Sequence, residues 1–506
     1  MKKLLLTLIV SLSLALPPVG AAVAGTLSPD LKAALQTAPP DEPIAVIVRL
    51  RKKANLNQFK MLKRNLRRTK IIEALKQEAE ADQTEILDRL RNKNVKKLRK
   101  LWLMNGIAME ATPNVIRLLK KQPAVKEIRL DAVLMLSSGA SGGSGSGEWN
   151  VGMIQADTLW SAGVTGQGVV IASMDSGVDV FHNALSGSYR GGGNSWFDPN
   201  GQHSTPFDMD GHGTQTLGVL VGAGGMGVAP GARWMAVKIF NDSGAAALSA
   251  IHAGYQWLLD PDNNPETDDA PDVVNNSWGF SDRVDECYDE FFDDIHALRT
   301  AGIAVVFAGG NSGPGASTSV SPGNNPGSLA VGAVDSGGQV TSQSSSGPSA
   351  CGSGVYPHLA APGLGVRTAN LTYGAFPDLT TYASGTSIAS PHVAGALALL
   401  RSAEPTASVA ALEQALLDSA LDAGPAGPDN DYGHGLVQVY DAYLALGGGG
   451  GDPPPEPQCF DDDDDGFFSA ASDPECGEPV DCEDANAAVY PGAVEIAKDG
   501  VDQDCN

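Results

Sequence analysis

The chain has few long apolar runs, few cysteines and little basic charge outside one segment. Beyond the N-terminal stretch, no run is apolar over the roughly 20 residues needed to cross a bilayer, so we expect no membrane span. Only 6 of the 506 residues are cysteine, and most of them crowd near the C-terminus. Cys287 and Cys351 lie in the central region. A bridge between them is one possible pairing, and it would stabilise the fold by about 4 kcal/mol through loop closure.

The N-terminus has the pattern of an export signal. Met1-Lys2-Lys3 precedes a short apolar run, and Ala22-Val23-Ala24 offers a cleavage site, which is typical of a secretory signal peptide over residues 1–24. A membrane anchor is the alternative, but prolines interrupt the run early. We therefore expect a secreted, extracellular protein, free or held at the cell surface, whose cysteines can oxidise.

Basic residues concentrate in residues 25–136, where Lys and Arg outnumber Asp and Glu two to one. The rest of the chain is acidic, and the net charge of the whole is −25. A basic segment can bind nucleic acid. In an exported chain with an acidic neighbour, binding to that neighbour is favoured instead, because opposite surface potentials attract.

Residues 25–136 have the pattern of a small α+β unit. We expect strands at residues 43–50, 105–111 and 124–131, a long helix within 56–101 and a shorter helix over 112–122. Residues 137–147 are rich in Gly and Ser, which predicts a flexible linker that proteases can cut. A folded basic unit, a cleavable linker and a large acidic domain together suggest a zymogen.

The acidic region, residues 148–447, alternates apolar Val- and Ile-rich runs with helical stretches. This pattern predicts an α/β domain with a mostly parallel sheet covered on both faces. Sites in such sheets lie beyond the carboxyl ends of the strands, where Asp175, Ser277 and Asn311 fall. The expected strands cover residues 168–177, 232–240, 271–279, 302–311 and 327–335, and the expected helices cover 245–259 and 286–301.

Four side chains of this region together suit nucleophilic hydrolysis. Ser387 is a candidate nucleophile, His212 a base for its proton, Asp175 a carboxylate to orient that base, and Asn311 an amide donor for the oxyanion. Each has a plainer interpretation when taken alone: Ser387 as a helix cap, Asp175 or Asn311 as a turn residue, His212 as a loop histidine. Their joint presence favours catalysis.

The segments MDSGVDVFHNAL, DGHGT, NNSWG, AGGNSGPG and SGTSIASPHVAG carry a family resemblance. Residues 148–447 resemble a subtilisin-type (subtilase) serine endopeptidase of the bacillopeptidase-like branch, with its three-layer sandwich and its Asp, His, Ser order. The resemblance implies that Asp175 orients His212, that His212 acts as base and then acid, and that Ser387 attacks the carbonyl. Asn311 and the Ser387 backbone amide correspond to the oxyanion hole.

The same resemblance implies a substrate pocket. Its two walls correspond to Ser277, Trp278 and Gly279 on one side and to Ala308, Gly309 and Gly310 on the other. Small walls and an uncharged Val320 near the floor imply broad specificity, with apolar or aromatic residues preferred before the cut. One departure is Gln215, which stands where most relatives have a second histidine.

Residues 25–136 resemble the inhibitor-type propeptide of that family, most clearly in NGIAMEATPNVIRLLKKQPAVKEIRLD. This implies a folding helper and temporary inhibitor of the chain's own peptidase, removed at or soon after Leu136. The long basic helix departs from the compact family version.

The C-terminal region follows a Gly/Pro linker, residues 448–457, and is acidic over residues 458–506. It resembles a metal-binding repeat with thrombospondin-like loops, which implies calcium as a structural cofactor. A solvated acidic tail is the alternative, and zinc is disfavoured because the ligands are hard oxygens. The candidate ligands are Asp461, Asp463, Asp465, Asp481, Asp484, Asp499, Asp502 and Asp504.

The sequence therefore predicts a monomeric, secreted serine endopeptidase made as a zymogen. It needs no cofactor for catalysis, acts on protein and peptide substrates, and does not bind nucleic acid. The alternative is a catalytically inactive subtilase that serves as a calcium-dependent binding module, with Gln215 as its sequence support.

Overall fold

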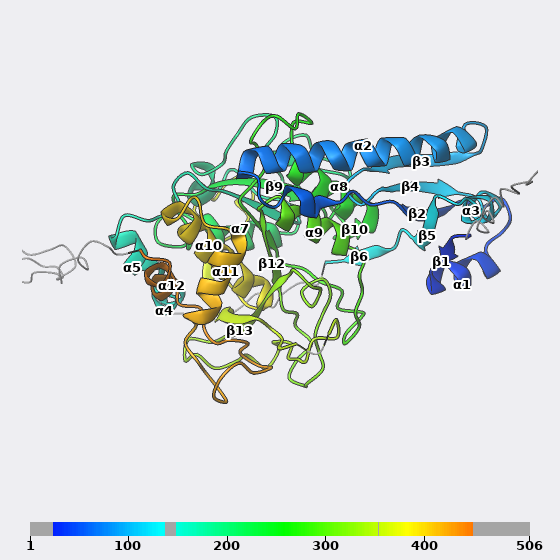
Figure 1. The fold of residues 1–506 in the computed structure, drawn as a ribbon. Coiled ribbons are helices and arrows are strands. Elements are labelled where there is room, and N and C mark those ends of the chain that lie inside the picture. Colours follow the sequence, from blue (N-terminus) through cyan, green and yellow to red (C-terminus); the bar gives the residue numbers. More distant parts are fainter. Residues whose placement is uncertain (1–23, 137–147, 353, 449–506) are drawn as a thin grey trace, which may run out of the picture.

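The computed structural model describes residues 24–136, 148–352 and 354–448. The expected signal peptide lies outside this range except for Ala24, and so do the linker at 137–147 and the acidic C-terminal region. Two units are visible, an N-terminal unit of residues 24–136 and a larger domain that follows it (Figure 1). None of the helices in these ranges is long and apolar enough to cross a membrane.

The N-terminal unit contains a five-stranded sheet in the order β1-β5-β2-β4-β3, where the sequence predicted an α+β unit with three strands. Strand β1 pairs in parallel with β5, and the other pairs are antiparallel. One face of the sheet packs on apolar residues of α1 and α3 and on the end of α2. Its elements are β1 (Thr26–Leu27), α1 (Pro29–Thr37), β2 (Ile44–Leu50), α2 (Arg64–Leu90), β3 (Val95–Leu101), β4 (Gly106–Ala111), α3 (Pro113–Lys120) and β5 (Val125–Leu130).

The helix expected within residues 56–101 is wrong at both ends. Leu56–Phe59 is a short 3-10 turn, helix α2 covers only Arg64–Leu90, and Val95–Leu101 is strand β3. The segment RNKN at 91–94 carries two asparagines, which favour a turn and end the helix. The next residues then pair with the edge of β4, so tertiary pairing outweighs their mixed local propensity.

The larger domain contains a seven-stranded sheet in the order β14-β13-β12-β11-β7-β9-β8, in which all pairs are parallel. Their near-continuous Val, Ile and Ala residues are buried on both faces, which explains the parallel arrangement. The expected α/β class is confirmed. The strands are β7 (Val170–Asp175), β8 (Trp196–Phe197), β9 (Arg233–Lys238), β11 (Val273–Asn276), β12 (Ala304–Ala308), β13 (Leu329–Val334) and β14 (Leu359–Pro362).

Helices cover both faces of this sheet (Figure 1). On one face lie α7 (His212–Val221), α10 (Thr386–Ala403), α11 (Val409–Asp418) and α12 (Val439–Ala445). Helix α10 is buried almost all round, as its Ala- and Leu-rich sequence requires. On the other face lie α8 (Leu248–Leu259) and α9 (Phe292–Thr300). Smaller elements are α4 (Trp149–Met153), α5 (Ala156–Ser161), α6 (Asn183–Ser186), β15 (Val366–Ala369) and β16 (Thr380–Ala383).

Helices α8 and α9 lie between the seven-stranded sheet and the N-terminal unit. One apolar cluster contains residues of the large sheet, of both helices and of β2, β4 and α2 from the N-terminal unit. Helix α8 begins at Leu248 and not at residue 245 as expected, because Ala245–Ala247 forms strand β10. This strand pairs antiparallel with β6 (Val133–Met135), the last strand before residue 137.

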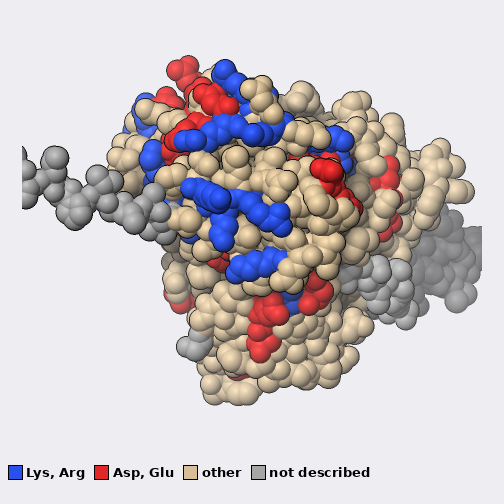
Figure 2. Space-filling model, turned by 90° about the vertical axis from the view of Figure 1, so that its right-hand side faces the viewer, with Lys and Arg blue, Asp and Glu red and all other residues tan. Residues whose placement is uncertain are grey.

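Opposite charges also join the units. Arg64 and Arg68 of α2 pair with Asp272 and Asp268, and the same helix contributes Lys76, which pairs with Asp260. The front half of α2 is therefore a docking surface, which accounts for its length. Further pairs join Arg49 and Lys53 to Asp293, and Arg129 to Asp289 and Glu290. Other basic residues stay on the surface, in bands visible from the end of the molecule that carries α1 and α3 (Figure 2).

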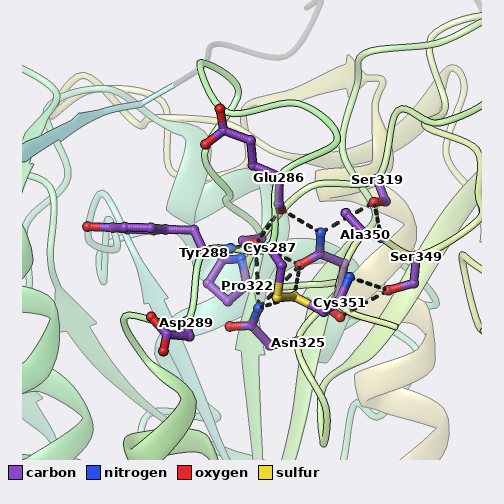
Figure 3. The surroundings of a disulfide bond; sticks show 12 residues. Glu286, Cys287, Tyr288, Asp289, Ser319, Pro322, Asn325, Ser349, Ala350 and Cys351 are labelled. Carbon is purple, nitrogen blue, oxygen red and sulfur yellow. Dashed lines mark hydrogen bonds between the residues drawn. A yellow bond between two sulfur atoms is a disulfide. The ribbon is translucent and has the colours of Figure 1, made fainter. Parts of the chain in front are cut away.

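Cys287 and Cys351 form the disulfide that the sequence left as one possible pairing (Figure 3). The bond joins two loops of the large domain, with 64 residues of separation and a Cα–Cα distance of 4.7 Å. Asn325 donates a hydrogen bond from Nδ2 to Sγ of Cys351, at 3.1 Å. The bridge therefore fixes the loops that follow β11 and β13 to each other.

Candidate active site

Asp175 and His212 meet at the carboxyl end of the large sheet. Asp175 is the last residue of β7, and His212 is the first residue of α7. Oδ1 of Asp175 accepts a hydrogen bond from Nδ1 of His212 at 2.7 Å, and both residues are buried. Nε2 of His212 has no hydrogen-bond partner among the described residues. The ring is therefore held in the tautomer whose Nε2 can accept a proton.

Charge around His212 decides its protonation. Burial by itself lowers the pKa of the imidazole, but the negative charge and hydrogen bond of Asp175 outweigh it, with help from Asp210 and Asp208. The pKa of His212 is therefore raised above its ordinary value of 6.5. Neutral His212, the form that can act as a base, predominates only above that raised value.

Asp208 organises the loop that presents His212, a role that sequence reasoning missed. Its buried carboxylate accepts hydrogen bonds from the Ser176 and Thr214 hydroxyls and from backbone amides of this loop, including Gly211. The Ser176 hydroxyl in turn accepts from the backbone amide of Gly213. The spacing DMDGHG carries the signal, since an acid a few residues before a glycine-rich turn often holds that turn by side-chain bonds.

Ser387 is the second residue of α10, and it is buried apart from its access to a cleft. The alternative of a helix cap does not describe it, because the cap position is Gly385 and has no side-chain bond. Its backbone carbonyl accepts a hydrogen bond from the Ser277 hydroxyl at 2.7 Å. Helices α7 and α10 pack against each other, so their first turns, which carry His212 and Ser387, belong to adjoining elements. The helix N-terminus favours negative charge near Ser387.

Asn311 is exposed, and its amide is oriented by Thr386. Oδ1 of Asn311 accepts hydrogen bonds from the backbone amide and the hydroxyl of Thr386, at 2.9 and 3.0 Å. Nδ2 is thereby left as the outward-facing donor. A Cβ built on Gly385 would lie 3.3 Å from both Nδ2 of Asn311 and Oγ of Ser387, so the two groups border the same small space. Thr386 therefore sets the direction of this donor.

A cleft brings most of the predicted pocket residues together with Ser387 and Asn311. Its lining includes Ser277, Trp278, Gly279, Ala308 and Gly310, together with Val320 and Thr386. It contains no charged side chain among the described residues.

Two glycines keep this pocket open. A Cβ on Gly279 would lie 3.0 Å from the Val320 side chain, and a Cβ on Gly310 would lie 2.7 Å from it. The two glycines therefore flank Val320, as expected for the two walls and the floor of the pocket. Gly309 is the exception to the predicted set. Its amide bonds to Val331, its carbonyl accepts from the Tyr356 hydroxyl, and it does not line the cleft.

The end of the N-terminal unit lies in the same cleft. Strand β6 runs antiparallel to β10, and the Leu136 amide donates to the Gly244 carbonyl at 2.8 Å. Met135 and Leu136 line the cleft beside Ser277 and Ser387. Side chains alternate along this strand: Leu134 is buried in the apolar cluster of α8, whereas Val133 and Met135 are exposed. The segment thus lies as an extended peptide leading toward Ser387.

Two other points from the sequence concern Gln215 and the suggested metal ligands. The Gln215 side chain makes no hydrogen bond to a described residue; its backbone amide donates to the Gly211 carbonyl, and its backbone carbonyl accepts from the Thr368 hydroxyl. All eight aspartates suggested as metal ligands, from Asp461 to Asp504, lie outside the described residues.

Comparison with known proteins identifies the domain. A family model described as "Subtilase family" matches residues 166–435, and one described as "Putative metal-binding motif" matches residues 481–506. Bacillopeptidase F of Bacillus subtilis is 33% identical over 75% of this chain, but the chain spans only 29% of that protein. Subtilisin E of the same species is 32% identical over 70% of the chain and 85% of its own length.

Subtilisin of Bacillus pumilus is 34% identical over 58% of the chain, which covers 98% of that relative. The matched range contains the Asp175–His212 pair, Asn311, Ser387 and the other cleft residues of the larger domain. The expected family is therefore confirmed: the chain belongs to the subtilase family and is a serine endopeptidase by class.

Proposed function

We propose that this protein is a secreted endopeptidase made as a zymogen, in which residues 25–136 are an inhibitory propeptide that blocks the cleft until it is cut away. The observation that carries the proposal is that Met135 and Leu136, at the end of the strand paired with β10, line the same cleft as Ser387. An extended segment paired with β10 occupies the place that a substrate strand needs. Ion pairs from Arg64, Arg68 and Arg129 hold it there.

In the proposed mechanism, Ser387 attacks the scissile carbonyl while His212 takes the hydroxyl proton at Nε2. Asp175 holds the imidazole and stabilises its positive charge. The oxyanion accepts hydrogen bonds from Nδ2 of Asn311 and from the Ser387 amide. His212 then gives its proton to the leaving amine, the C–N bond breaks, and water hydrolyses the acyl-enzyme by the same steps in reverse order. One donor of this type contributes roughly 10²–10³ in kcat, a magnitude known from the subtilisin asparagine itself.

The cleft supports a broad preference for apolar or aromatic side chains before the cut. Gly279 and Gly310 leave room on either side of Val320, and no charged side chain among the described residues selects Lys or Arg. Burial of Leu134 beside Ala246 adds an apolar contact further from the cut. We place the maturation cut in the segment that follows Leu136.

Export and metal binding complete the proposal. The pattern of residues 1–24 supports secretion, and the metal-binding motif at 481–506 together with its Asp-rich sequence supports calcium as the cation of the C-terminal region. The role of the basic segment as a nucleic-acid binder is disfavoured, because many of its Arg and Lys residues already pair with carboxylates of the same chain.

The deciding variant is Ser387→Ala, which keeps the fold and removes the nucleophile. We expect loss of casein hydrolysis, loss of labelling by a fluorophosphonate and persistence of the uncut precursor on mass spectrometry. Ser186→Ala, an exposed serine on α6, is the matched control and should process normally. If Ser387→Ala still cleaves casein, the nucleophile is elsewhere. If the unaltered chain neither processes nor takes the label, the inactive binding module replaces the enzyme.

A further inference from the structure

The loop between α8 and β11 gathers three carboxylates away from the candidate active site. Asp260, at the C-cap of α8, lies near Asp262 and Asp269, and one oxygen from each falls within 4.8 Å of the others. The negative end of the α8 dipole adds to this negative charge. Close carboxylates repel one another, so such a group alone favours a partner of positive charge.

Asp260 supplies a second and separate observation. Its side chain is only 1% exposed, and its Oδ1 is buried with no hydrogen-bond partner among the described residues. Its other oxygen, Oδ2, pairs with Lys76 of the N-terminal unit. A buried acceptor left unpaired costs about 1–3 kcal/mol, and more when it is charged. A cation bound between the three carboxylates would remove that cost.

The cations already present do not meet this need. Lys76 contacts Asp260 Oδ2 and Asn263 Oδ1, and its ion pairs reach neither Asp262 nor Asp269. Arg190 donates to the backbone carbonyl of Asp269, whose carboxylate Oδ2 accepts a hydrogen bond from the uncharged Nδ2 of Asn194 at 2.9 Å. The carboxylates thus remain under-compensated.

The ligand chemistry selects a hard cation. All three groups offer carboxylate oxygens, and no thiol or imidazole joins the cluster in the part of the chain that is described. Asp260, Asp262 and Asn264 alternate along the loop, the spacing used by oxygen-rich calcium loops. Asp262 and Asn264 also hold the turn, since they accept from the Asn264 and Glu266 amides.

We propose that this loop is a calcium site of the peptidase domain, with Asp260 Oδ1, Asp262 and Asp269 as protein ligands and water in the remaining positions. Bound calcium would tie the end of α8 to the segment that leads into β11 and so to Ser277. Lys76 competes with the ion for Asp260, because its ammonium occupies the second oxygen of that carboxylate. The site is separate from the C-terminal motif at 481–506.

The test uses the full chain carrying Ser387→Ala, which prevents self-cleavage, and CaCl₂ as the titrant in calorimetry. The double variant Asp262→Asn/Asp269→Asn should bind one Ca²⁺ fewer than its parent and lose part of the calcium-dependent rise in Tm. Asp282→Asn/Asp285→Asn removes the same charge from exposed residues with no ion pair among the described residues, and should match the parent. Equal stoichiometry and equal Tm gain in the first variant would overturn the proposal.

A second variant covers the case in which the double variant does not fold. Lys76→Met leaves every carboxylate intact and frees Asp260, so calcium affinity at this site should rise at least fivefold. Lys53→Met, which removes another interface lysine that pairs with Asp293, is its control and should leave the affinity unchanged. An unaltered calcium affinity in Lys76→Met would contradict the assignment of Asp260 as a ligand.

Discussion

The two faces of the seven-stranded sheet are closed in different ways. On one face, α7, α10, α11 and α12 bury a continuous set of Val, Leu, Ile and Ala side chains. On the other face, α8 and α9 bury a comparable set against the sheet, but their outer surfaces then meet the N-terminal unit. There the contact is mixed, with an apolar centre and a border of Arg, Lys, Asp and Glu.

The two faces differ because one must stay packed and the other must be able to release the N-terminal unit. Apolar burial, at roughly 25 cal/mol per Å², stabilises the packing of helices on the first face. The border of the second face contains buried carboxylates such as Glu290, and also charge pairs whose carboxylates are partly open to water, with Asp268 43% and Asp289 62% exposed. Such pairs weaken with salt and can be hydrated when the partner leaves. An interface built in this way suits a unit that must bind firmly and later separate.

Arg68 is where this interface is most vulnerable. Its side chain is 4% exposed, and its guanidinium donates to Asp268 and to the carbonyls of Ala270, Pro271 and Ala301. Burial lowers the pKa of Arg68 to about 10, so it stays charged near neutral pH. Arg68→Ala leaves those buried carbonyls unpaired, and we expect the docked N-terminal unit to lose about 3–5 kcal/mol.

Urea unfolding of the Ser387→Ala chain, followed with limited proteolysis of residues 25–136, measures that loss. The N-terminal unit should become protease-sensitive at a urea concentration at which the large domain is still intact. Lys93→Ala, an exposed lysine with no ion pair among the described residues, should change nothing. If Arg68→Ala and Lys93→Ala behave alike, the charged border does not hold the unit.

Much of this fold follows from local sequence signals. Apolar runs between helical stretches indicated the parallel sheet, and every expected strand of the large domain is present. The N-terminal unit was harder, because Val95–Leu101 is a strand only through its pairing with β4, which lies further along the chain. Strand β10 was assigned to a helix for the same reason, since its partner β6 is more than 100 residues away.

The site residues fall into two similar groups: those that local sequence predicts and those whose role depends on tertiary contacts. Asp175 and Asn311 fall at or just beyond the ends of buried strands, and Ser387 opens an apolar helix, so motif and position agree. What the sequence did not reveal are the residues that act through others. Thr386 matters because it turns the Asn311 amide, and Asp208 because it closes the His212 loop. The role of Thr386 depends on the direction of a hydrogen bond to a residue far along the chain, which local spacing does not encode, whereas the spacing DMDGHG does carry a local signal for Asp208.

The disulfide belongs to the large domain alone, so its removal separates the stability of that domain from the hold on the N-terminal unit. Cys287→Ser/Cys351→Ser opens a closed loop with 64 residues of separation and should destabilise the large domain by roughly 2–4 kcal/mol. Urea unfolding of the Ser387→Ala background, read by tryptophan fluorescence, measures the change. The reduced parent is the control and should resemble the variant. If residues 25–136 also became protease-sensitive below the unfolding midpoint, the stability of the large domain and the docking of the N-terminal unit would be coupled.

The smallest expected effect concerns the acid limb of activity. The pKa of His212 is raised above 6.5, against the opposing effect of burial, by Asp175 first and then by Asp210. Asp210→Asn keeps an oxygen that can accept from the His212 amide, as Oδ1 does now, but removes one negative charge. The pKa of His212 should then fall, so neutral imidazole forms at lower pH and the rise of kcat/KM shifts by a fraction of a pH unit toward acid. Asp418→Asn, exposed on α11, should leave the profile in place. A shift toward alkaline pH would contradict the electrostatic role of Asp210.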